Sequence, residues 1–94
     1  MTKADIVNEI SKDTGIEKVT VQKAIEAFME TIKGSLVGGK NVYLRGFGSF
    51  IVKERAEKTA RNISKNTTII IPKHFIPAFK PSKSFVTNVK ENVK

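Results

Sequence analysis

Apolar residues follow a helical period through residues 1–40 and a strand-like pattern after that. The clearest run extends from Val21 to Leu36, where apolar positions recur every three or four residues until Gly38-Gly39 interrupts them. A shorter run around Val7 has the same spacing and should end near Gly15. The pattern predicts that the N-terminal part of the chain is a pair of helices.

Residues suited to capping helices sharpen these boundaries. Thr2 followed by Asp5 is an acidic variant of a capping box, and the second helix should begin near Glu17. Ser82 is expected to cap a last helix within residues 82–94. Its apolar stripe would consist of Phe85, Val86, Val89 and Val93.

The segment 41–81 contains short apolar runs that predict β-strands. One strand is expected over Asn41–Leu44, a turn at Arg45-Gly46, and a second strand over Phe47–Val52. Phe47 and Phe50 are three residues apart, so a bulge near Gly48 is expected to bring both rings to one face. Gly46 and Gly48 suit either a tight turn or the close approach of a phosphate.

Residues 53–72 are predicted to form a β-arm that extends from the sheet. The stretch from Lys53 to Asn62 has almost no apolar content, and the apolar strand Ile69–Ile71 follows it. Two strands joined by a polar, basic middle are typical of a long hairpin. A hairpin with no hydrophobic face is not stable alone in water, so we expect a binding partner to stabilise it.

The distribution of charge indicates what that partner is. The 94 residues carry a net charge of +8, and the pI is near 9.9. Residues 1–52 hold seven Lys/Arg and six Asp/Glu, whereas residues 53–94 hold ten and three. Positive charge concentrated in one segment is typical of a protein that binds a polyanion. Nucleic acid is the first candidate for this partner, and an anionic membrane is the second.

Other classes of protein find little support in the sequence. Residues 34–40 fit the first seven positions of a phosphate-binding loop, but Asn41 stands where Ser or Thr should bind magnesium, and the glycines close a helix. There is no cysteine and a single histidine, His74, so we expect no metal site, no cofactor and no enzyme activity. No apolar run is long enough to span a bilayer, and the predicted location is cytoplasmic.

Several motifs, in order along the chain, resemble the bacterial HU / integration host factor family of histone-like proteins. They are Gly46-Phe47-Gly48-Ser49-Phe50, Arg55, Lys58, Arg61-Asn62, Ile69-Ile70-Ile71-Pro72 and Pro77-Ala78-Phe79-Lys80-Pro81. The resemblance covers the whole chain as one domain. It implies an α+β fold with a helical pair, a three-stranded antiparallel sheet with a protruding β-arm, a short C-terminal helix and an intertwined dimer.

The resemblance also implies roles for individual residues. The arm would contact the DNA minor groove through Lys53, Arg55, Lys58, Arg61, Asn62 and Lys65. The body would contact phosphates through Lys3, Arg45, Gly46, Gly48, Lys73, Lys80 and Lys83. The dimer core would contain Phe28, Phe47, Phe50 and Phe79. The dimer would be a homodimer or a heterodimer with a paralogue, associated with the nucleoid.

The predicted arm tip departs from the family pattern. The family usually has proline after Arg-Asn, and this chain has Ile63, while Ala60 replaces the usual glycine. Isoleucine is an apolar wedge of suitable size to enter a base step, although it lacks the fixed φ of proline. Ile63 is therefore either an intercalating wedge or an exposed tip residue that bends DNA little.

We predict little sequence specificity, because few residues suit base-specific hydrogen bonding and the minor groove separates A·T from G·C only coarsely. The predicted function is an architectural protein that binds, bends or compacts duplex DNA, including kinked or gapped DNA. The alternatives are a site-specific DNA-bending subunit similar to integration host factor, and a protein that binds RNA or another structured nucleic acid.

Overall fold

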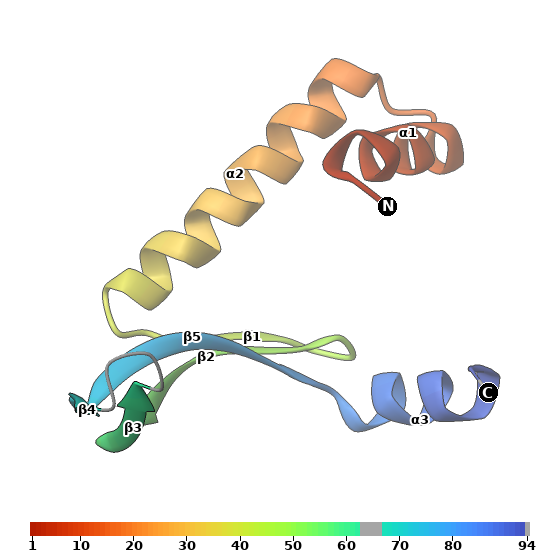
Figure 1. Cartoon of the computed structure of the whole chain (residues 1–94). Helices are drawn as coiled ribbons and strands as arrows, with labels where there is room; N and C mark the ends of the chain where they lie inside the picture. Colours follow the sequence, from red (N-terminus) through yellow and green to blue (C-terminus); the bar gives the residue numbers. More distant parts are fainter. Residues whose placement is uncertain (63–66, 94) are drawn as a thin grey trace. The chain divides into compact units, whose positions relative to one another are not determined.

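The computed structural model describes residues 1–62 and 67–93 and divides the chain into two compact units, residues 1–35 and 36–94. The first unit contains helix α1 (Lys3–Thr14) and most of helix α2 (Lys18–Val37). The second contains strands β1 (Val42–Leu44), β2 (Gly48–Arg55), β3 (Lys58–Asn62), β4 (Thr67–Ile71) and β5 (His74–Pro81), and helix α3 (Lys83–Asn92) (Figure 1). The α+β class predicted from the sequence is confirmed.

The N-terminal boundary of α1 is fixed by the predicted capping box. The Thr2 hydroxyl accepts a hydrogen bond from the Asp5 backbone, and the Asp5 carboxylate accepts one from the Thr2 backbone at 2.8 Å. The bond from the Thr2 N–H, followed by one that the Thr2 hydroxyl donates to the same carboxylate at 3.0 Å, lowers the pKa of the Asp5 carboxyl. Gly15 ends the helix in the left-handed conformation, with φ of 76°, as glycine most easily does.

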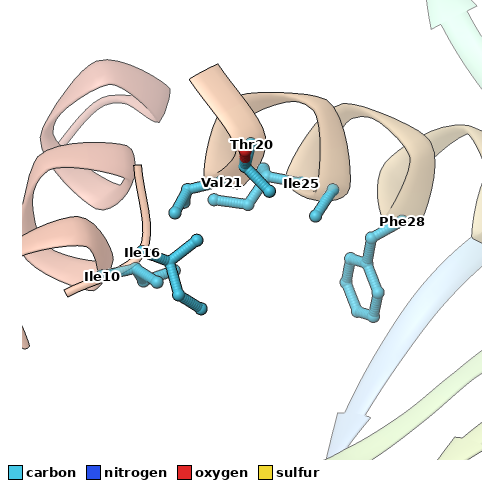
Figure 2. Close-up of a pocket in the computed structure, with 7 residues that line it drawn as sticks. Ile10, Ile16, Thr20, Val21, Ile25 and Phe28 are labelled. Carbon is cyan, nitrogen blue, oxygen red and sulfur yellow. The ribbon is translucent and has the colours of Figure 1, made fainter. Parts of the chain in front are cut away.

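The two helices bury little apolar surface between them. Val7, Val21 and Ile32 are the buried apolar side chains of the described residues, and Phe28 remains 48% exposed. An apolar groove of about 320 Å³ lies along the pair, and Figure 2 shows Ile10 and Ile16 facing α2 across it. The helical stripe predicted from the sequence therefore extends beyond what the pair itself covers.

Strands β1, β2 and β5 form an antiparallel sheet in the order β1-β2-β5. The β1–β2 register runs without interruption from Val42↔Phe50 to Leu44↔Gly48, so the bulge expected near Gly48 is absent. Phe47 was expected to start the second strand but lies in the turn before it, where its N–H donates to the Leu44 carbonyl at 3.0 Å. The turn, with Gly46 at φ of 80°, places the Phe47 ring on the same face of the sheet as the Phe50 ring, where both contact Phe79.

The arm continues the pairing of β2 with β5 after one interruption. The β2–β5 ladder ends at Arg55↔His74, and the β3–β4 ladder resumes at Lys58↔Ile71 and reaches Asn62↔Thr67. Two residues are unpaired on each side, so the register is the same before and after the break. One of the four is Pro72, which has no N–H to donate to the ladder.

Four phenylalanines form a cluster on one side of the sheet. The Phe79 ring centroid lies 4.9 Å from that of Phe50 and 5.2 Å from that of Phe47. Phe85 of α3 stacks on Phe47 at 5.5 Å. Gly48 lies directly beneath this cluster, where an added Cβ would be 2.6 Å from the Lys80 carbonyl oxygen and 2.8 Å from the Phe79 ring. Gly48 is thus required by close packing between β2 and β5.

This contact predicts opposite effects for two glycine substitutions. Gly48→Ala should destabilise the protein by about 1–3 kcal/mol, because the sheet must shift to admit the methyl group. Gly34→Ala is the matched control, since Gly34 lies in α2 with nothing within 4 Å of the added Cβ. It should stabilise by about 0.5–1 kcal/mol. Denaturant unfolding measures both, and an unchanged midpoint for Gly48→Ala would contradict the close approach.

Candidate nucleic-acid interface

The register of the three-stranded sheet separates its side chains into two chemically different faces. Paired residues of antiparallel strands point to the same side, and the side alternates along each strand. We call one side the aromatic face; it carries Val42, Leu44, Phe50, Val52, Glu54, Phe75, Pro77 and Phe79. We call the other side the basic face; it carries Tyr43, Ser49, Ile51, Lys53, Arg55, His74, Ile76, Ala78 and Lys80.

The basic face contains three of the cations predicted to bind DNA and no carboxylate among its paired residues. Lys53, Arg55 and Lys80 are exposed, and they come from strands that are hydrogen-bonded neighbours. The nearest acidic residue along β2, Glu54, points to the opposite face. The structure therefore brings these three predicted residues together on one surface.

Lys73 does not join this group. Its ammonium forms an ion pair with the Glu54 carboxylate, with a Nζ–Oε1 distance of 3.2 Å. Because Glu54 belongs to the aromatic face, this contact places the Lys73 ammonium on that side of the ribbon. Its predicted role in phosphate binding finds no support in this position.

A second group of predicted residues meets where α3 begins. The Ser82 hydroxyl donates to the Gly46 carbonyl at 3.1 Å and accepts from the Phe85 N–H at 3.3 Å, so it caps α3 and ties it to the turn. The Ser82 N–H also donates to the Phe47 carbonyl at 2.9 Å. These bonds hold the turn of Arg45 and Gly46 next to the first residue of α3, Lys83.

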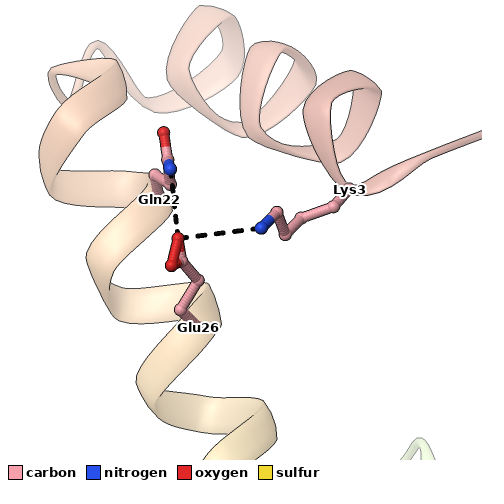
Figure 3. A network of polar contacts seen from close by, with 3 residues as sticks. All are labelled: Lys3, Gln22 and Glu26. Carbon is pink, nitrogen blue, oxygen red and sulfur yellow. Dashed lines mark hydrogen bonds and ion pairs between the residues drawn. The ribbon is translucent and has the colours of Figure 1, made fainter.

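Lys3 lies in the helical unit and takes part in a separate polar network. Its ammonium is 3.7 Å from a Glu26 carboxylate oxygen, which also accepts a 3.0 Å hydrogen bond from the Gln22 side chain (Figure 3). Both ends of the ion pair are about half exposed, so the pair adds little to stability. The Lys3 ammonium thus forms an ion pair with the Glu26 carboxylate in this structure, whereas the sequence predicted that it contacts a DNA phosphate.

The arm presents cations and apolar side chains without a core of its own. Lys58 and Arg61 are exposed on β3, where they pair with Ile71 and Thr68 of β4. On β4, Ile69, Ile70 and Ile71 are 46%, 63% and 37% exposed. Asn62 ends β3. The predicted wedge Ile63 and the predicted contact Lys65 lie outside the described residues.

Tyr43 is a basic-face residue that the sequence interpretation did not assign to the interface. It is 72% exposed and pairs across the strands with Ser49, which in turn pairs with Lys80. The sequence does contain a signal for this position. Side chains alternate between the two faces of a strand, so Tyr43 must lie on the face opposite to that of its apolar neighbours Val42 and Leu44.

His74, the single histidine of the chain, is also exposed. Its Nδ1 lies 2.9 Å from the Pro72 carbonyl oxygen, at the break between the sheet and the arm. Within residues 1–62 and 67–93, no three His, Cys, Asp or Glu side chains gather as metal ligands would. In the same residues, no helix has the length and apolar character needed to cross a membrane.

A sheet with a segregated basic face and a two-stranded arm defines the class of a β-ribbon nucleic-acid-binding protein. Comparison with known proteins identifies the family. The sequence pattern of bacterial DNA-binding proteins matches residues 1–90, and the chain belongs to this family.

Relatives of this chain cover nearly its full length. It is 36% identical to integration host factor subunit beta of Marinobacter nauticus, over the whole chain and 97% of that protein. It is 37% identical to DNA-binding protein HU of Geobacillus stearothermophilus, over 96% of the chain and all of that protein. Among solved structures, HU of Anabaena in a cocrystal with DNA superposes with a TM-score of 0.87, at 31% identity and full coverage of both chains.

Proposed function

We propose that this protein is an architectural DNA-binding protein that acts as a dimer and bends or compacts duplex DNA with little sequence specificity. The observation that carries the proposal is the separation of charge by the sheet register. Lys53, Arg55 and Lys80 share one face without a carboxylate, and the aromatic cluster occupies the other. A surface of this kind attracts a polyanion mainly through the release of its counterions.

The proposed dimer is supported by apolar surface that the single chain leaves uncovered. Besides the groove along α1 and α2, a second apolar groove of about 270 Å³ lies between α3 and the end of β5. Phe47 and Phe79, at the centre of the aromatic cluster, remain 45% and 40% exposed. A second copy or a paralogous chain that covers these surfaces would supply the core that a chain of this size otherwise lacks.

The arm and the start of α3 supply further contacts in the proposed complex. An exposed two-stranded ribbon with Lys58 and Arg61 suits insertion into the minor groove, and Ile63 is proposed as its wedge. Lys83 is the first residue of α3, where the helix dipole disfavours a cation, and no acidic residue is present in this turn. A bound phosphate would relieve that unfavourable interaction. A location at the nucleoid follows from this function.

The test is a comparison of binding and bending on several nucleic acids. We expect duplexes of mixed sequence to bind with similar affinity, with affinity falling steeply as salt rises. Energy transfer between labels at the two duplex ends should increase on binding, and Ile63→Ala should reduce this increase while binding to straight DNA is kept. A roughly thousandfold preference for one site would favour a site-specific subunit. Stronger binding to structured RNA would contradict the proposal.

A further inference from the structure

We propose that the Tyr43 hydroxyl donates a hydrogen bond to a phosphate of bound duplex DNA. The inference rests on the proposed function, because it assigns one more contact within the same interface. Its starting point is the position of a large ring that contributes little to the core. Tyr43 is 72% exposed on the basic face, whereas Val42 and Leu44 are half-buried on the aromatic face.

Tyr43 belongs to a row of hydrogen-bond donors that crosses all three strands. It pairs with Ser49 of β2, and Ser49 pairs with Lys80 of β5. Neighbouring strands are about 4.8 Å apart, so the row is about 10 Å long. Each DNA strand carries one phosphate for about every 3.4 Å of helix axis, and a row of this length therefore faces more than one phosphate. A phenol, a hydroxyl and an ammonium can all donate to such a group.

The contacts of the Tyr43 oxygen leave its proton available. The side-chain NH2 group of Asn41 donates to the Tyr43 oxygen at 3.2 Å. The side-chain oxygen of Asn41 accepts a hydrogen bond from the Val52 N–H at 2.9 Å. The second bond anchors Asn41 to the backbone of β2, so the first one holds the phenol in place. Among the described residues, the Tyr43 hydroxyl proton meets no acceptor. A DNA phosphate accepts hydrogen bonds without donating any, so it is a suitable acceptor for the Tyr43 hydroxyl proton.

The substitution Tyr43→Phe isolates the hydroxyl, because the ring is kept. We expect the affinity for a labelled duplex of mixed sequence, measured by fluorescence anisotropy, to fall about tenfold. The slope of affinity against salt should stay unchanged, because a neutral hydroxyl releases no counterion. Lys80→Gln, in the same row, should lower both the affinity and the slope. Thr31→Val removes an exposed hydroxyl from α2 and should leave both unchanged.

A direct measurement on the unaltered protein is also possible, because Tyr43 is the sole tyrosine and the chain contains no tryptophan. Protein with carbon-13 in its tyrosine rings reports this residue alone by nuclear magnetic resonance. Unlabelled duplex should shift these signals, and this test does not depend on the folding of any variant. Binding of wild type to no duplex would contradict the proposed function. Equal binding by wild type and Tyr43→Phe, with unshifted ring signals, would overturn only the role of Tyr43.

Discussion

Replacing Phe79 by alanine is expected to lower the free energy of unfolding by about 3–5 kcal/mol. The Phe79 ring contacts Phe47, Phe50 and Phe85, with centroid distances of 5.2, 4.9 and 6.4 Å, so its removal takes away the centre of the cluster. The full value applies to a completely buried ring, and in the single chain Phe79 is 40% exposed. A loss of this size therefore requires a second chain that covers the remainder of the ring.

Chemical unfolding at two protein concentrations separates the contribution of packing within one chain from that of packing against a second chain. In a dimer that unfolds to separate chains, the midpoint of unfolding rises with protein concentration, and Phe79→Ala should lower the midpoint at both concentrations. Phe75→Ala is the control, because Phe75 lies on the same face of β5 but is 63% exposed. It should change stability by less than about 0.5 kcal/mol. A concentration-independent midpoint with a small loss for Phe79→Ala would contradict the dimer.

The helices could be predicted closely because their signals are local. Thr2 and Asp5 bond to each other's backbone across three residues, and Gly15 ends α1 by its own conformation. Ser82 begins α3 in the same way, through a bond to the Phe85 N–H. Each of these boundaries depends on residues fewer than five positions apart, so neither the sheet nor a partner is needed to infer them.

The sheet was harder to predict because its register depends on residues far apart in the sequence. The three-residue spacing of Phe47 and Phe50 suggested a bulge, whereas the chain places Phe47 in a turn that β1 and α3 both hold through hydrogen bonds. Those bonds join Phe47 to Leu44 and to Ser82, and the second partner is thirty-five positions away along the chain. The break in the arm did have a local signal, Pro72, whose missing N–H cannot extend the ladder.

In the candidate site, too, some features could be predicted from the sequence, whereas others depend on the pairing of residues far apart in the chain. Composition alone indicated a basic surface, and the resemblance to the family indicated which residues form it. Composition could not show that Lys53, Arg55 and Lys80 share a face, or that Lys73 forms an ion pair with Glu54 on the other side. These placements follow from the β2–β5 pairing, which joins residues about twenty to thirty positions apart.

Neutralising the basic face is expected to give the largest loss of DNA affinity. In the combined variant Lys53→Gln, Arg55→Gln and Lys80→Gln, affinity for a mixed-sequence duplex should fall at least about a hundredfold near physiological salt. The slope of the logarithm of affinity against the logarithm of salt should fall by about 0.9 for each phosphate contact removed. All three side chains are exposed, so the fold should be kept. Titration by fluorescence anisotropy at several salt concentrations measures both quantities.

The control removes the same charge from elsewhere in the chain. Lys12→Gln, Lys23→Gln and Lys33→Gln lower the net charge equally, but these exposed lysines lie on α1 and α2. None of these three lysines belongs to the basic face, so the variant keeps the cations of that face and should bind within about threefold of wild type. Equal losses in the two variants would mean that net charge alone attracts DNA. A selective loss in the first would mean that the sheet register, by placing cations on one face, creates the binding surface.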